Sequence, residues 1–167
     1  MKRVVSDTGP LLHLLEAESL DLLGHAGQVF IPPAVLTELL AHHRRWSTDQ
    51  PPWVEVVALE PTFAHEGISW WHSGLLDQGE AEAVALSAQL SPDWFLTDDT
   101  AARMIAQAQG FEVHGSLGVV LWAAAMGHLD FDGAKSALAR LAGSSLWISA
   151  RVLGEAQDAL KRIFFHE

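Results

Sequence analysis

Short apolar runs with the composition of β-strands alternate with helical stretches along most of this chain. Strands that alternate with helices are typical of a parallel sheet covered by helices on both faces. The sequence predicts strands at residues 3–6, 28–31, 54–59, 94–97 and 111–113. It predicts helices at residues 10–15, 19–25, 33–43, 70–76, 78–90, 100–109, 117–126, 131–141 and 149–164, and a surface loop at 45–52. We therefore expect an α/β fold.

The length and composition limit the kinds of protein that this chain can be. Its 167 residues correspond to one domain, and 49% of them are hydrophobic, which is enough for a substantial core. The absence of cysteine excludes disulfides, thiolate metal sites and a cysteine nucleophile. Ten Lys and Arg residues stand against 21 Asp and Glu residues, a formal charge of −11. Any binding of nucleic acid must therefore be local or assisted by cations.

The N-terminal segment resembles a secretory signal only at its two basic residues. Acidic residues at 7, 16 and 18 interrupt its apolar stretch, whereas a signal's apolar region is normally free of charge. The longest uninterrupted apolar candidate, residues 117–126, is far shorter than the ~20 residues that a membrane span needs. We therefore expect no signal peptide, no membrane contact and a cytoplasmic location.

Carboxylates directly follow two of the predicted strands. Asp7 comes after the first strand, and Asp98 and Asp99 come after the strand at 94–97. Ligands in parallel α/β folds bind at the carboxyl ends of the strands, so these acids are candidates for a site. Asp7 would also serve as a helix N-cap, and the two roles are compatible. One of the adjacent pair is expected to cap the next helix, and the other would repel it unless a cation or a proton intervenes.

Three glutamates lie at the edges of apolar helix stripes. Glu38 shares a stripe with Val35 and Leu39, where a carboxylate is unfavourable unless it is paired. The alternative is a side chain at the edge of the stripe that reaches solvent. Glu80 and Glu82 lie on opposite shoulders of a seam of small apolar residues, and the helical periodicity does not choose between them. The alternative is that both are ordinary acidic residues in the first turn of a helix, where the helix dipole favours negative charge.

These acids share a chemistry as well as a place in the predicted fold. Ligand sets made only of oxygen suit Mg²⁺ or Mn²⁺ rather than zinc. A carboxylate cluster that holds such ions is typical of phosphodiester hydrolysis, in which the metal activates water and stabilises charge on the reacting oxygens.

Four segments of the chain together resemble a known family. They are VVSDTGPLLHLL, VFIPPAVLTELL, LDQGEAEAVALSAQL and FLTDDTAARMIAQAQGFEVHGSLGVVLWAAAMGHLD, and as an ordered set they resemble a PIN domain of the VapC-like branch. The resemblance covers residues 3–130. It implies a three-layer α/β/α domain with a central parallel sheet, an acidic pocket and Mg²⁺- or Mn²⁺-dependent ribonuclease activity. It also implies the toxin of a type II toxin–antitoxin pair, whose small antitoxin protein places its tail in that pocket.

The resemblance implies roles for particular side chains. The family's first aspartate falls on Asp7, its helix glutamate on Glu38 and its T-x-D acid on Asp99. The third acid, usually Asp in VapC proteins, falls on Glu80, which is longer by one methylene. Asp7 and Asp99 are then expected to hold the principal ion, while Glu38 and Glu80 complete the shell or hold a second one. Asp98 is an extra ligand or an outer-shell group.

Four further residues are candidate contacts for the RNA substrate. Arg103, one turn after Asp99, would neutralise the acids or touch a phosphate. Arg44 and Arg45 end a predicted helix, where they form either a solvated helix end or a local phosphate-binding patch. Ser116 resembles the family's small hydroxyl residue near the pocket, and we prefer its interpretation as a helix N-cap.

We expect a single domain over residues 1–167, with its core at 3–130. The helices at 131–165 carry an apolar face that packs either on this core or on the second copy of a homodimer. Paired tryptophans at 70 and 71 belong either to the core or to a surface for an antitoxin or a second copy.

Two other functions compete with a nuclease. A receiver-like phosphoacceptor would need an acidic pair after the first strand and a lysine at a late strand end, and this chain has neither. A catalytically silent PIN-like module that acts by partner binding is the other alternative. The presence of every family acid favours the active enzyme but does not establish activity.

Overall fold

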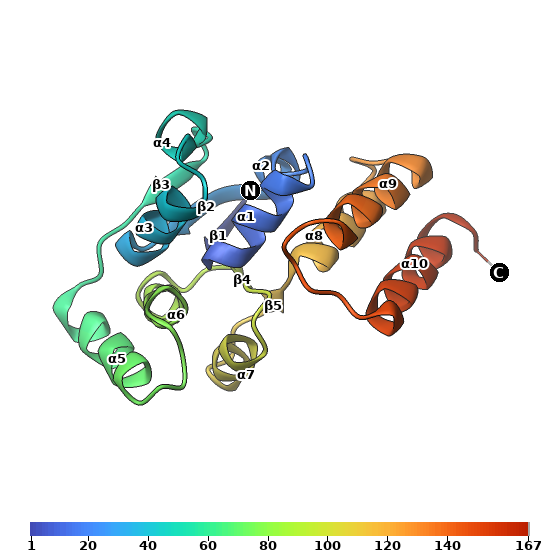
Figure 1. The fold of residues 1–167 in the computed structure, drawn as a ribbon. Coiled ribbons are helices and arrows are strands. Elements are labelled where there is room, and N and C mark those ends of the chain that lie inside the picture. Colours follow the sequence, from blue (N-terminus) through green and yellow to red (C-terminus); the bar gives the residue numbers. More distant parts are fainter. Residues whose placement is uncertain (167) are drawn as a thin grey trace.

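The computed structural model describes residues 1–166 and contains a five-stranded sheet in which every pairing is parallel, in the order β3-β2-β1-β4-β5 (Figure 1). The strands are β1 (Lys2–Ser6), β2 (Gly27–Ile31), β3 (Val54–Val56), β4 (Trp94–Leu96) and β5 (Val113–His114). The predicted α/β fold is therefore confirmed. Because β1 is central, Val4 pairs with Val29 on one side and with Trp94 on the other.

Ten helices are present among residues 1–166: α1 (Thr8–Glu16), α2 (Asp21–Ala26), α3 (Pro33–His42), α4 (Trp46–Asp49), α5 (Pro61–His72), α6 (Gln78–Leu90), α7 (Thr100–Ala108), α8 (Ser116–Ala125), α9 (Phe131–Ala142) and α10 (Ala150–Phe164). In Figure 1, α6 and α7 lie on one side of the central strands, and α1 and α8 lie on the other. No helix of this set combines the length and the apolar character that crossing a membrane requires.

The buried parts of the central strands are largely apolar because helices cover both of their faces. Val4 and Val5 of β1 and all three residues of β4 are buried. Continuous apolar runs of this kind are typical of buried parallel strands. On α6, Ala81, Val84 and Ala85 are almost fully buried, and this seam of small side chains lets neighbouring elements approach closely. Because β1 and β4 are neighbouring parallel strands, the acids that follow them lie at the same edge of the sheet.

Three local predictions were wrong. The segment predicted as a surface loop contains α4, whose Trp46 is fully buried and donates through Nε1 to Gln50 Oε1 at 3.1 Å. The helix predicted at 70–76 is α5, which begins at Pro61, where the fixed φ of proline suits a first helical turn. The third strand is shorter than predicted, since β3 is an edge strand of three residues.

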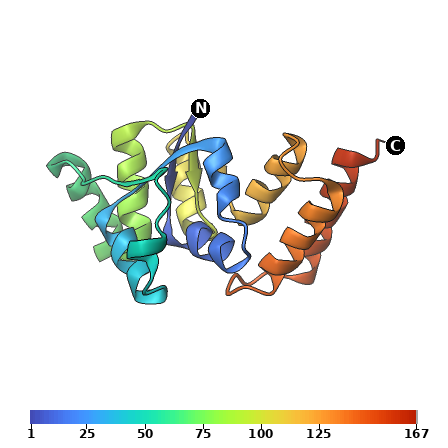
Figure 2. The same cartoon turned by 90° about the horizontal axis from the view of Figure 1, so that it is seen from above.

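The C-terminal helices pack on the rest of the chain. α9 lies against α8 and α1, and α10 lies against α9 and α8 (Figure 2). Leu138 and Leu141 of α9 and Leu160 of α10 are buried in these contacts. The segment that joins α9 to α10 returns to the end of α1, where Ser145 donates to Glu16. This return brings residues 145–147 to the same edge of the sheet as the acids.

Candidate functional site

A cavity of about 540 Å³ lies at the carboxyl ends of β1 and β4. Six carboxylates line it: Asp7, Glu38, Asp77, Glu80, Asp98 and Asp99. Five of them are the acids predicted from the sequence, so the fold brings together residues that are as much as 92 positions apart in the chain. Thr8, His13, His42 and Trp147 are among the other lining residues.

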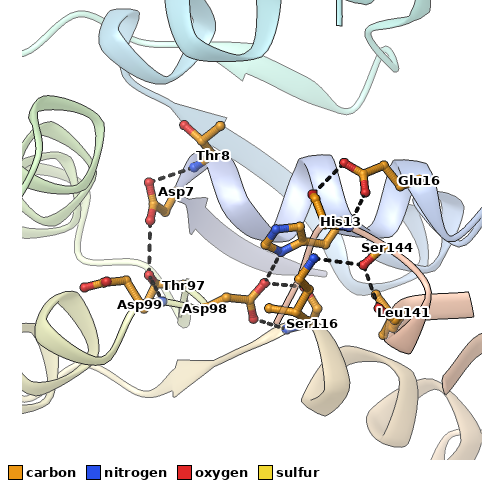
Figure 3. Close-up of polar contacts among 12 residues, drawn as sticks. Asp7, Thr8, His13, Glu16, Thr97, Asp98, Asp99, Ser116, Leu141 and Ser144 are labelled. Atoms are coloured by element: carbon orange, nitrogen blue, oxygen red, sulfur yellow. Dashed lines mark hydrogen bonds and ion pairs between the residues drawn. The ribbon is translucent and has the colours of Figure 1, made fainter. Parts of the chain in front are cut away.

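Asp7 is buried at the end of β1 and also caps α1 (Figure 3). Its Oδ1 accepts from the backbone N of Thr8 at 2.7 Å, and its Oδ2 accepts from Thr97 Oγ1 at 3.1 Å. Burial raises the pKa of Asp7 to about 8 against the lowering effect of the Thr8 hydrogen bond, and the charges of Glu80 and Asp77 raise it further. The cap and the cavity-lining position therefore coexist in one side chain.

Glu38 is half-buried, and its hydrogen bonds tie α3 to α1 and α6. Its Oε2 accepts from Thr8 Oγ1, and its Oε1 accepts from the backbone N of Gly79 at 3.2 Å. Burial raises the pKa of Glu38 above its ordinary value, although the hydrogen bond from Thr8 partly offsets this. Glu38 is therefore paired within the fold, although its side chain remains partly exposed.

The structure distinguishes the positions of the two glutamates that helical periodicity left open. Glu80 lines the cavity, whereas Glu82 faces α3 and accepts from the backbone N of Ala34 at 3.2 Å. Glu80 forms a capping box with Asp77, in which each side chain accepts from the other's backbone N–H. Burial raises the pKa of Glu80 to about 7, and the nearby charges of Asp77 and Asp99 contribute to the shift.

Asp98 and Asp99 have different surroundings, although they are adjacent. Asp99 caps α7, as predicted for one member of the pair, by accepting from the backbone N of Ala102 at 2.9 Å. Asp98 accepts from the backbone N and the Oγ of Ser116 at 2.7 and 2.6 Å, and its Oδ2 lies 2.7 Å from His13 Nδ1 (Figure 3). Burial raises the pKa of Asp98, but these hydrogen bonds outweigh it and hold the pKa below its usual value.

The candidate substrate contacts are not all at the cavity. Arg103 lines a second, adjoining cavity of about 330 Å³, while Arg44 and Arg45 are exposed and line neither. The preferred interpretation of Ser116 as an N-cap was wrong, because Gly115 holds that position and Ser116 Oγ donates to Asp98.

Several residues of the cavity were not predicted from the sequence, among them Asp77 and His13. Asp77 had a readable signal, since an acid three positions before a glutamate predicts a capping box. His13 had none, because its partner Asp98 is 85 positions away and only the tertiary fold joins them.

The carboxylates fit a hard divalent cation by chemistry. All of their donors are oxygens, and burial, with a smaller contribution from neighbouring acids, raises the pKa values of Asp7, Glu38 and Glu80 in one cavity, where a cation would stabilise their charged forms. Among residues 1–166, no three acidic or histidine side chains converge closely enough to form a metal site by themselves. Mg²⁺ usually keeps several waters and needs only one or two protein carboxylates, so this spacing is compatible with it.

Comparison with known proteins places residues 3–162 within one family. A family model described as a PIN domain (DUF3368) matches this range, which includes β1 from its second residue, the other four strands and every acid of the cavity. Searches of curated proteins and of solved structures found no match.

Proposed function

We propose that this chain, which belongs to the PIN domain family, is a Mg²⁺- or Mn²⁺-dependent endoribonuclease that hydrolyses RNA phosphodiester bonds. PIN domains are typically nucleases and generally use divalent metal ions. The observation that best supports this activity is the cavity at the strand ends, where burial raises the pKa values of Asp7, Glu38 and Glu80 together. Such a site favours a cation, and an acidic protein needs one to accept a phosphate.

In this proposal, Asp7 and Asp99 hold the principal ion, directly or through water, and Glu38 and Glu80 complete its oxygen shell. The bound ion supplies a nucleophile at neutral pH and neutralises charge on the phosphate. Thr97 orients Asp7 by donating to its Oδ2.

Asp98 has a different part in the proposed site. Its oxygens already accept from Ser116 and pair with His13, so we assign it to the positioning of β4, α1 and α8 rather than to direct ligation. Hydrogen bonds of this kind fix the backbone on which the adjacent Asp99 is carried.

Cleavage of a mixed RNA substrate tests the activity. Purified protein is incubated with Mg²⁺, with Mn²⁺ and with EDTA, beside the variants Asp7→Asn and Glu82→Gln. We expect cutting that requires the metal, is lost in Asp7→Asn and persists in Glu82→Gln, because Glu82 lies on the same helix as Glu80 but outside the cavity. Equal cutting by Asp7→Asn would show that the activity comes from another site or from a contaminant.

A catalytically silent PIN-like module is the second candidate. The observation in its favour is that no three potential ligands converge among the described residues. Calorimetry with Mn²⁺ separates the two functions. The nuclease should bind Mn²⁺ and lose this binding in Asp7→Asn, whereas a silent module should bind no Mn²⁺, so that Asp7→Asn would change nothing.

We further propose that the nuclease is the toxin of a toxin–antitoxin pair, with a small antitoxin protein as its partner and a homodimer as its assembly. Support comes from the likeness of four sequence segments to the VapC-like branch. Induced expression in a bacterial host is expected to arrest growth, and Asp7→Asn is expected to abolish the arrest. Growth that continues at matched expression of the active enzyme would contradict the toxin role.

A further inference from the structure

We infer that Trp147 is a platform on which an unpaired base of the RNA substrate stacks beside the acidic cavity. This inference rests on the proposed function and names the side chain that would bind a base of its substrate.

Trp147 lies on the ridge between two cavities. It lines the acidic cavity and also the adjoining one that contains Arg103, and the two cavities share Asp98, Leu146 and Trp147. Trp147 is 85% exposed, whereas the next most exposed tryptophan among the described residues, Trp71, is 40% exposed. Packing in the hydrophobic core therefore does not account for Trp147, whose side chain exposes most of its surface at the edge of the site.

Hydrogen bonds to α1 and to the end of α9 hold the segment that carries Trp147 in place. Ser145 donates from its backbone N and its Oγ to the two carboxylate oxygens of Glu16, each at 2.7 Å. Ser144 Oγ donates to the carbonyl of Leu141 at 2.6 Å and accepts from the backbone N of Leu146 at 3.2 Å (Figure 3). An aromatic side chain on a fixed loop loses little conformational entropy when a ligand covers it.

The second cavity supplies a positive group next to this aromatic surface. Arg103 lines it together with the apolar side chains of Ile148 and Val152. Within residues 1–166, Arg103 has no ion-pair partner. A flat aromatic side chain beside an available guanidinium matches one nucleotide, since the base stacks on the ring and the phosphate meets the cation.

The substrate on this ridge must be unpaired. In a duplex the faces of the bases are covered by their neighbours, whereas loops and single strands expose a base that can stack on a side chain. A strand that runs from Arg103 over Trp147 reaches the acidic cavity, because the two cavities adjoin at Trp147.

Cleavage kinetics and binding of a labelled single-stranded RNA test the inference. Initial rates in Mn²⁺ give kcat and KM, and fluorescence anisotropy in Ca²⁺ gives Kd. We expect Trp147→Ala to raise KM and Kd about 5- to 150-fold, the range for one lost base–aromatic stack, while kcat changes less than about threefold. Trp147→Phe should recover most of the binding, and Trp71→Ala, the matched exposed tryptophan away from both cavities, should leave it unchanged.

The outcomes separate this inference from the proposed function. If the wild type cuts RNA and Trp147→Ala keeps the same KM and Kd, the platform is overturned and the nuclease stands. If Trp147→Ala instead loses self-association in sedimentation or the binding of a protein partner, with RNA binding intact, Trp147 is a protein contact and the inference is equally overturned. If the wild type neither cuts nor binds RNA, the proposed function is overturned, and the inference about Trp147 is overturned with it.

Discussion

A Cβ atom on Gly79 would lie 2.5 Å from both carboxylate oxygens of Glu38. The backbone N of Gly79 also donates to Glu38 Oε1, so α6 begins against the carboxylate that α3 contributes to the cavity. Only a residue without a side chain allows this approach. The position of Glu38 therefore depends on the glycine that precedes Glu80.

Gly79→Ala is expected to lower the free energy of unfolding by at most about 1 kcal/mol, because the added Cβ meets only the far end of the Glu38 side chain, which must move and give up its hydrogen bond from Gly79. Urea denaturation measures this change. Gly154→Ala is the matched control, since Gly154 lies within α10 and its Cβ would meet nothing within 4 Å. There the substitution should stabilise the protein by about 0.5–1 kcal/mol through helix propensity. Equal effects at both positions would contradict the role given to Gly79.

The stability of the metal-free protein is expected to fall as the pH rises from about 4 to about 8. The folded-state pKa of Asp7 is about 8 and that of Glu80 about 7, both above their ordinary values. Over this interval the folded state keeps protons that the unfolded state has released, so the free energy of unfolding decreases with pH and levels off above the folded pKa. Urea midpoints in EDTA at a series of pH values measure the slope. A flat or rising profile would show that the carboxylates are not destabilised by burial.

Mg²⁺ or Mn²⁺ is expected to raise the Tm, most strongly near pH 8, where the cavity carboxylates are ionised. Asp7→Asn removes a buried charge, so it should stabilise the metal-free protein at pH 8 by at least ~1 kcal/mol, the equivalent of less than one unit of raised pKa. The same variant should weaken the thermal response to metal. Scanning calorimetry with and without each ion measures both effects, and Glu82→Gln serves as the control that keeps the response.

The acids at the strand ends could be predicted because local sequence patterns determine their positions. Asp7 follows β1 and Asp99 precedes α7, and both positions can be read from a short apolar run followed by a helix start. The boundaries of α6 were predicted correctly at Gln78–Leu90, since its seam of small residues has a clear helical period. Which elements surround the cavity follows from the parallel order of the sheet.

The parts that were missed depend on tertiary contacts. A helical wheel places Glu80 and Glu82 at similar angles on either side of the apolar seam of α6. Only the packing of α3 beside α6 shows that Glu82 lies towards Ala34. The buried Trp46 and the pairing of His13 with Asp98 likewise join segments whose relation no local pattern records. The fold was therefore more predictable than the detailed partners of its polar side chains.

His13→Ala is expected to destabilise the protein by about 2–4 kcal/mol at pH 7, because it leaves the buried carboxylate of Asp98 with one partner fewer. Ser116→Ala should have a smaller effect of the same sign. The double variant should be non-additive, since both residues serve the same carboxylate. A double-mutant cycle by urea denaturation measures the coupling. Additive effects would show that the three residues do not act as one network.

Glu80→Gln separates the charge of this residue from its structural part in the capping box. Gln at this position can still accept from the backbone N of Asp77, so the first turn of α6 should be preserved, and the metal-free protein should be at least as stable as the wild type at neutral pH because a partly buried charge is removed. The cavity nevertheless loses one negative oxygen donor, so metal-dependent cleavage should fall by ~100-fold or more. Glu80→Ala removes both functions and should lose stability as well as activity. If Glu80→Gln kept full activity while Glu82→Gln lost it, the acid that faces away from the cavity would be the functional one and the proposed metal site would be wrong.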